Sequence, residues 1–95
     1  MNGSKDRINK LRDFMIKNHI DLILIESEMN RYYFTDFRSS EGSLIITLKE
    51  SILIVDSRFY EAARKTLKED EVLESNNRDE FIKEFCKNKK YNRIL

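Results

Sequence analysis

The stretch Ser43-Leu-Ile-Ile-Thr-Leu-Lys-Glu-Ser-Ile-Leu-Ile-Val55 contains two short apolar runs that are rich in β-branched residues. Only Lys49 and Glu50 clearly separate the runs Ser43–Leu48 and Ser51–Val55. Runs of this length and composition are typical of strands, and the short connection predicts an antiparallel hairpin. The connection lacks the Asn-Gly pair of a two-residue loop, so the sequence indicates the pairing better than the turn type.

The residues before this hairpin predict a helix and then a strand. The helix extends over Ser4–Asn18, and Asn18 or His19 ends it, because Asn and His tolerate the left-handed conformation. Its expected buried face holds Ile8, Leu11, Phe14 and Met15, and its expected water-facing side holds Lys10, Arg12, Asp13 and Lys17. The strand Ile20–Ile25 contains an unbroken apolar run, which indicates cover on both faces.

The residues after the hairpin predict a second helix and a further strand. Asp56 or Ser57 can cap the helix, which is expected to extend to Lys68. Asp56 also follows a strand, where α/β proteins often place functional groups, and Arg58 can pair with Asp56 or with a carboxylate elsewhere. The strand is expected over Glu71–Glu74.

A last helix is predicted from Asn77, with Glu80 in the position that completes a capping box. Its expected buried stripe consists of Phe81, Ile82, Phe85 and Cys86. Residues 91–95 have the pattern with which another strand would begin. This order of elements predicts one α/β domain in layers around a mixed sheet.

The composition narrows the classes of function. The 95 residues carry 18 Lys and Arg against 17 Asp and Glu, and this balance argues against nucleic acid or an anionic membrane as the main partner. The single cysteine, Cys86, excludes an internal disulfide and fits a reducing compartment. No secretory or membrane-spanning apolar stretch is present, so we expect a cytoplasmic protein.

The residues offer little catalytic chemistry. His19 and Cys86 are the only histidine and cysteine, and we expect the first to end a helix and the second to be a small buried thiol. A metal site would need clustered ligands, and a phosphate loop would need more glycines than Gly3 and Gly42. From residue chemistry alone, the chain is a small α/β domain without an active site of its own.

One connection is unusual for its aromatic content. Asn30-Arg-Tyr-Tyr-Phe-Thr-Asp-Phe-Arg-Ser-Ser-Glu-Gly42 lies between two strongly apolar runs and holds Tyr32, Tyr33, Phe34 and Phe37. Its first part, with the residues just before it, predicts a short helix over Glu28–Phe34. Either the rings are core residues beneath a long loop, or the loop serves a site.

This connection resembles the Asn-x-x-Tyr-Leu-Thr-Gly-Phe-x-Gly-Ser-x-Gly signature of the creatinase/prolidase N-terminal domain. The segment Ile54-Val-Asp-Ser-Arg-Phe-Tyr-Glu-Ala-Ala63 is similar to the Ile-Thr-Asp-x-Arg-Tyr-x-x-Gln-Ala segment of the same family. Leu11-Arg12 with Met15, and Ile20-Asp21-Leu22, also match the family pattern. Because the motifs occur together and in order over most of the chain, the chain is identified as a member of this family.

The resemblance implies a ribonuclease-H-like α/β fold with three layers and a mixed sheet flanked by helices. In Xaa-Pro aminopeptidases, Xaa-Pro dipeptidases and creatinases this domain precedes a catalytic "pita-bread" domain. The peptidases of the family hydrolyse the bond before proline with two divalent metal ions (Mn, Co or Zn). Their metal ligands lie in the catalytic domain, so the resemblance implies no cofactor and no catalytic residue in this chain. We therefore expect residues 1–95 to be the N-terminal domain, incomplete at its C-terminal end and without the catalytic domain.

The resemblance also implies roles for particular residues. In relatives this domain builds dimer contacts and helps to wall off the active site, and a loop of it reaches toward the partner subunit's site. By position, that loop consists of Arg38, Ser39, Ser40 and Glu41. Arg38 would suit a substrate carboxylate and Glu41 a free amine. The motif residues expected to be structural are Asn30, Tyr33, Thr35, Phe37, Gly42, Asp56 and Arg58, with Tyr33 and Phe37 anchoring the base of the loop.

The chain departs from the family pattern at three positions. Asp36 and Ser39 replace glycines of the motif, and Phe59 stands where tyrosine is usual. Since glycine permits positive φ angles, the loop backbone can differ from that of relatives, although Asp tolerates such angles better than most residues.

Two other classes of function stay open from the sequence. The first is a free-standing interaction module without peptidase activity, and the second is a small nucleotide- or RNA-binding domain, which the balanced charge disfavours. The reading frame beyond Leu95 separates the first from a peptidase. An Asp/Asp/His/Glu/Glu ligand set there would indicate the enzyme, and a stop codon would indicate the module.

Overall fold

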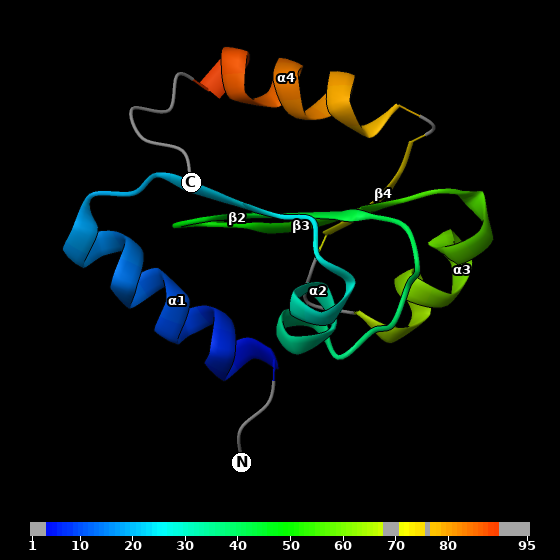
Figure 1. Ribbon diagram of the computed structural model, residues 1–95, viewed down its shortest axis with the longest axis horizontal. Coiled ribbons are helices and arrows are strands. Elements are labelled where there is room, and N and C mark those ends of the chain that lie inside the picture. Colours follow the sequence, from blue (N-terminus) through cyan, green and yellow to red (C-terminus); the bar gives the residue numbers. More distant parts are fainter. Residues whose placement is uncertain (1–3, 68–70, 76, 90–95) are drawn as a thin grey trace.

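The computed structural model describes residues 4–67, 71–75 and 77–89, which form a four-stranded sheet flanked by helices (Figure 1). The elements in chain order are α1 (Ser4–Asn18), β1 (Leu22–Ile25), α2 (Glu28–Thr35), β2 (Ser43–Thr47), β3 (Ser51–Val55), α3 (Ser57–Thr66), β4 (Glu71–Glu74) and α4 (Arg78–Lys89). The predicted α/β class with a mixed sheet is therefore confirmed.

The strands lie in the order β1-β2-β3-β4. β1 and β3 pair antiparallel with β2, so the predicted hairpin is confirmed, and Ser43 lies opposite Ile54. β4 pairs parallel with β3 after the α3 crossover. In the hairpin turn, the Thr47 hydroxyl oxygen accepts from the backbone N–H groups of Lys49 and Glu50, at 3.2 and 3.0 Å.

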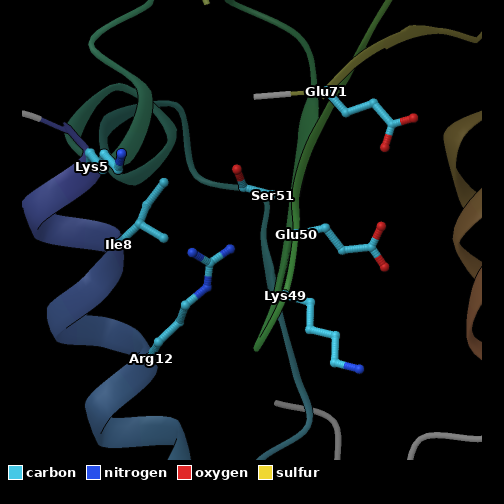
Figure 2. Close-up of a pocket in the computed structure, with 7 residues that line it drawn as sticks. All are labelled: Lys5, Ile8, Arg12, Lys49, Glu50, Ser51 and Glu71. Atoms are coloured by element: carbon cyan, nitrogen blue, oxygen red, sulfur yellow. The ribbon is translucent and has the colours of Figure 1, made fainter. Parts of the chain in front are cut away.

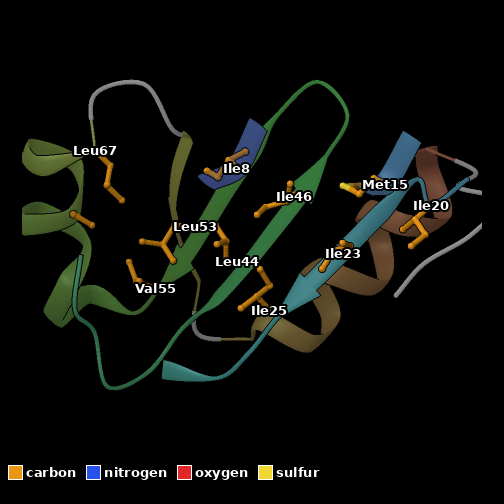
Figure 3. Packing of buried hydrophobic residues seen from close by; sticks show 11 residues of the cluster. Ile8, Met15, Ile20, Ile23, Ile25, Leu44, Ile46, Leu53, Val55 and Leu67 are labelled. Atoms are coloured by element: carbon orange, nitrogen blue, oxygen red, sulfur yellow. The ribbon is translucent and has the colours of Figure 1, made fainter. Parts of the chain in front are cut away.

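Each face of the sheet is covered, which explains the unbroken apolar runs. The first cluster joins the sheet to α1 and α3 (Figure 3) and contains Ile8, Met15, Ile20, Ile23, Ile25, Leu44, Ile46, Leu53, Val55, Ala63 and Leu67. The second cluster contains Leu22, Ile45, Ile52 and Ile54, against which Phe81, Ile82, Phe85 and Cys86 of α4 pack. Figure 1 shows α4 alone on its side of the sheet, opposite α1, α2 and α3, so the molecule has three layers.

Most helix limits follow from local chemistry. α1 has the predicted bounds, and His19 follows it with φ 58°, in the left-handed region. Asp56 caps α3, accepting from the Arg58 backbone N–H. The Asn77 side chain accepts from the Glu80 backbone N–H at 3.2 Å and donates to the Glu80 carboxylate at 3.0 Å, which confirms Asn77 as the cap of α4.

Several expectations were wrong in detail. Phe14 is 49% exposed, so it does not belong to the buried face of α1. Arg12 is half-buried, because its guanidinium reaches the β2 end of the hairpin and donates from Nε to the Thr47 carbonyl at 2.8 Å.

The element ends also differ slightly from those expected. β1 begins at Leu22 rather than Ile20, α2 extends through Thr35, β2 ends at Thr47, and α3 ends at Thr66. Lys68 and the strand expected at residues 91–95 lie outside the described residues.

Candidate functional site

The predicted loop lies where the ends of all four strands meet. β1, β3 and β4 run in one direction and β2 in the other, as the register places Ile25 beside Leu44 and Val55 beside Glu74. The carboxyl ends of β1, β3 and β4 therefore share an edge with the start of β2, which residues 36–42 enter from α2. This edge of the sheet gathers the motif residues of the chain.

Arg31 is the centre of the loop base, although the sequence did not single it out. Its side chain is buried, with 2% exposure, and its guanidinium donates to the carbonyl oxygens of Ser39, at 2.6 Å, and Glu26. Desolvation by burial lowers the pKa of Arg31 from its usual value. Within the described residues, Nε of Arg31 and the hydroxyl of Ser39 are buried without a hydrogen-bond partner.

Thr35 and Asp36 turn the chain from α2 into the loop. The Thr35 hydroxyl donates to the Arg31 carbonyl at 2.7 Å and accepts from the Phe37 N–H at 3.1 Å. Asp36 is left-handed, with φ 59°, and its N–H donates to the Tyr32 carbonyl. Arg7 of α1 binds the Asp36 carboxylate at 2.8 Å. The prediction that Asp36 tolerates a positive φ is thus confirmed.

A second set of polar contacts holds the other end of the loop. Glu41 forms an ion pair with Arg78 at the start of α4, with 3.4 Å between nitrogen and oxygen. Arg78 also donates from Nε to the Ser43 hydroxyl at 3.1 Å, and this hydroxyl donates to the Glu26 carboxylate at 2.7 Å. This chain of contacts connects β1, the loop, β2 and α4.

Arg38 points away from both sets of contacts. Its guanidinium carbon lies 4.6 Å from the centroid of the Tyr32 ring, within cation–π range. Together with Glu28 and Met29, these two residues line a hollow of about 270 Å³ on the outer side of α2. Within the described residues, Arg38 has no carboxylate partner.

The aromatic residues divide between core and surface. Phe34 and Phe37 are half-buried and pack against the first cluster. Tyr33 is 53% exposed and Tyr32 is 41% exposed, so these two rings are not core residues beneath the loop. The helical turn of α2 places Arg31 inward and both tyrosines outward. The guanidinium carbon of Arg7 lies over the Tyr33 ring, 5.0 Å from the ring centroid.

The other motif residues have local roles. Asp56 accepts from the Arg58 guanidinium at 2.7 Å, which holds the pKa of that carboxyl below its usual range. The Asn30 backbone N–H donates to the N-cap Ser27, and Gly42 has φ 155°, where a Cβ would lie 3.1 Å from the Ile54 carbonyl oxygen. These residues lie at the same sheet edge, where Asp56 and Arg58 pair with each other.

A larger hollow, of about 500 Å³, lies at the opposite edge of the sheet (Figure 2). Ile8 and Arg12 of α1 point toward the sheet, whereas Glu50 and Glu71 lie on its other side. The hollow mixes both signs of charge and contains no residue of the Asn30–Gly42 connection or of the Ile54–Ala63 segment. In the described part of the chain, no three His, Cys, Asp or Glu residues gather to hold a metal ion. Among the same residues, no helix is both long enough and apolar enough to cross a membrane.

The family model of the creatinase/prolidase N-terminal domain matches residues 7–94. The chain belongs to this family. Over 91 residues, this creatinase/prolidase domain is 37% identical to a Mycoplasma genitalium protein that carries the name of an Xaa-Pro aminopeptidase. The match covers 96% of the chain and 26% of that relative, so the chain spans only a small part of the relative's length.

Solved structures share the fold of this creatinase/prolidase domain. The Streptococcus thermophilus aminopeptidase P structure superposes with a TM-score of 0.88 at 24% identity, over 98% of this chain and 73% of that one. The Xaa-Pro dipeptidase from Bacillus anthracis gives a TM-score of 0.82 at 26% identity, over 97% of this chain and 26% of that one. These matches establish the fold.

The sequence patterns predicted the position of the loop in this creatinase/prolidase domain, but they did not predict the residues that hold the loop in place. Arg31, Glu26 and Arg78 come from α2, the end of β1 and α4, and only the tertiary fold brings them together. Ser39, expected in the loop that reaches a partner, is buried with 3% exposure. Its side chain therefore belongs to the loop base, whereas Arg38, Ser40 and Glu41 are exposed.

Proposed function

We propose that this chain is the non-catalytic N-terminal domain of a metal-dependent Xaa-Pro peptidase, an enzyme that hydrolyses peptide bonds preceding proline. In the assembled enzyme the domain contributes to dimer contacts, and the segment from Arg38 to Glu41 helps to wall off the partner subunit's active site. The family membership supports the domain assignment. The relatives named as Xaa-Pro aminopeptidases support the reaction.

The observation that best supports a role of the loop in substrate binding is the outward position of Arg38. The loop that carries Arg38 is held by contacts at both of its ends. A guanidinium recognises a carboxylate through two parallel hydrogen bonds, so Arg38 suits an anionic group of a peptide. Glu41 is already paired with Arg78, which makes it the weaker candidate for binding a substrate amine. A wall of this kind limits substrate length and excludes water from the cleft.

The metal ions of the proposed enzyme, two Mn, Co or Zn ions, belong to its catalytic domain. The described residues do not fit such a centre, because no cluster of three possible ligands occurs among them. We therefore assign no catalytic residue in this chain, and its part in the reaction is to bind and enclose. We also place the enzyme in the cytoplasm, in line with the cytoplasmic peptidase PepQ of Mycobacterium tuberculosis, whose N-terminal domain has the same fold.

The test compares Arg38→Met with wild type in the assembled peptidase that contains this chain. We expect kcat/KM for a short Xaa-Pro peptide to fall about tenfold, the effect of losing one charge-assisted contact. Arg58→Met is the matched control, because Arg58 is exposed and pairs locally with Asp56, and it should leave kcat/KM unchanged. An Arg38→Met enzyme with unchanged kinetics toward short and long peptides would contradict the proposed role of the loop.

The isolated 95-residue chain provides the complementary test. With Mn, Co or Zn added, it should not hydrolyse an Xaa-Pro peptide, because the proposed catalytic domain is absent. Measurable hydrolysis by the purified chain would overturn the assignment as a non-catalytic domain.

A further inference from the structure

A buried arginine without a carboxylate partner is an unusual feature of this small domain. Arg31 is 2% exposed, and no ion pair to it occurs among the described residues. Burial of a charge is unfavourable unless hydrogen bonds compensate for it. The compensation here comes from the backbone, through the carbonyl oxygens of Glu26 and Ser39.

These contacts place Arg31 against both ends of the loop. Its guanidinium holds the Ser39 carbonyl, directly after Arg38. At the other end, a Cβ on Gly42 would lie 3.4 Å from Nε of Arg31, so the Gly42 backbone lies against the same side chain. The Arg31 guanidinium therefore lies between the Ser39 carbonyl and the Gly42 backbone and fixes the distance between them.

The remaining anchors of the loop act elsewhere. The ion pair between Glu41 and Arg78 and the hydrogen bond from Arg78 to Ser43 fix the segment that enters β2. Arg7 fixes Asp36, before the loop begins. In the described residues, the Thr35 hydroxyl bonds the N–H and the carbonyl of Phe37, just before Arg38, and Arg31 holds the Ser39 carbonyl just after it.

From this arrangement we infer that Arg31 is a positioning residue of the segment from Arg38 to Gly42, because it is the group that holds the Ser39 carbonyl and lies against Gly42. It binds no substrate itself. Its guanidinium binds the Glu26 carbonyl, just after β1, and the Ser39 carbonyl in the loop. By holding Ser39, it directs the neighbouring Arg38 guanidinium outward over the Tyr32 ring. A lysine cannot replace it, because a single ammonium lacks the planar, widely spaced donors that reach both carbonyl groups.

The experiment measures ¹⁵N order parameters in the isolated chain, comparing wild type with Arg31→Lys and Arg31→Met. In the wild type we expect values of about 0.85 at Arg38–Glu41, as in rigid backbone, and in both variants values below about 0.6 at these amides. The central amides of β2 and β3 should keep values near 0.85 in Arg31→Lys. Arg58→Met removes an arginine from the same sheet edge and should leave the loop unchanged.

Arg31→Lys decides the result, because it keeps a positive charge and most of the side-chain volume even if Arg31→Met does not fold. An ordered loop in Arg31→Lys would overturn the inference. Equal loss of order in the loop and in β2 and β3 would also overturn it, since Arg31 would then support the whole fold rather than the loop.

The consequence for peptide binding rests on the proposed function. In the assembled peptidase, Arg31→Lys should raise KM for a short Xaa-Pro peptide about as much as Arg38→Met does, because both changes displace the same guanidinium. If Arg38→Met has no kinetic effect, the proposed function fails, whereas the order parameters still test the role of Arg31. If only Arg38→Met has an effect, the positioning role fails and the proposed function stands.

Discussion

Asp56 shows how one side chain can serve two local purposes. Its carboxylate caps α3 by accepting from the Arg58 N–H at 3.0 Å, and it binds the Arg58 guanidinium at 2.7 Å. Hydrogen bonding to Arg58 favours the charged form of the carboxyl and lowers its pKa. The residue that matches the family motif is therefore accounted for by the start of a helix.

This pKa shift predicts a pH-dependent contribution to stability. Because the folded-state pKa is lowered, the contribution is complete above the ordinary carboxyl pKa of about 4 and is lost as pH falls through the folded value. Asp56→Asn keeps a capping oxygen but removes the charge. We expect it to lower the free energy of unfolding at pH 7, with a difference from wild type that shrinks below about pH 4.

Urea denaturation at several pH values measures this difference. Arg58→Met should reproduce the same loss at pH 7, and the double variant should lose little more than either single variant, since both remove one interaction. A difference between wild type and Asp56→Asn that persists at pH 2 would show that the ion pair is not its cause.

Residues whose behaviour depends on their immediate neighbours could be predicted from the sequence. His19 and Asp36 have positive φ angles, and Asp56 and Asn77 cap helices, as their residue types indicate. Arg31 could not be predicted in this way, because arginine is almost never fully buried and its partners are backbone atoms of distant residues. The outward position of Tyr33 was missed for the same reason, as Arg31 occupies the inward side of α2.

At the scale of elements, α4 has the simplest role, which is to cover one face of the sheet. Its half-buried Phe81 and Phe85 have ring centroids 6.2 Å apart and pack over Ile52 and Ile54. The opposite face is covered by α1 and α3. Ile54, with 0% exposure, therefore lies beneath α4 rather than at a free surface.

This placement predicts the cost of a small deletion on the covered face. Ile54→Val should lower the free energy of unfolding by about 0.5–1.5 kcal/mol, the usual cost of removing one buried methylene group. Ile16→Val is the matched control, because Ile16 is 61% exposed and should change stability by less than about 0.5 kcal/mol. Equal effects of the two variants in chemical denaturation would contradict the cover of this face by α4.

The strands were largely predictable, because each apolar run is too short for a helix and its lack of polar residues indicates that both faces of the strand are buried. Their ends were less predictable. Ile20 is buried and apolar like a strand residue, yet β1 begins at Leu22, because His19 turns the chain and the Ile20 N–H bonds the Met15 carbonyl at 2.8 Å. The pairing partners of β1 and β4 could not be predicted from the local sequence, because a helix separates each of these strands from its partner along the chain.

At the scale of the whole molecule, we expect the domain to need all three layers to stay folded. Both clusters are built on the same sheet, one on each face. Different helices cover the two faces, so loss of one helix would expose one face only. A chain of this size buries too little surface to lose a layer and remain folded.

A chain shortened to residue 75 tests this dependence. Without α4, the apolar side chains of Leu22, Ile45, Ile52 and Ile54 would face water, and we expect the shortened chain to self-associate or to unfold. Size-exclusion chromatography with light scattering and circular dichroism would detect either outcome, with the full chain as the control. A shortened chain that is monomeric and gives the native spectrum would contradict the three-layer account.

The strand order also has a consequence for colloidal behaviour. β1 and β4 are the outermost strands of the described sheet, and carboxylates bracket both of them, Asp21 and Glu26 around β1 and Glu71 and Glu74 at the ends of β4. An unpaired strand edge is a template for cross-β growth, and charges at such an edge oppose it. Two copies that approached edge to edge would bring these like charges together, and their repulsion would oppose growth of the sheet across the edge.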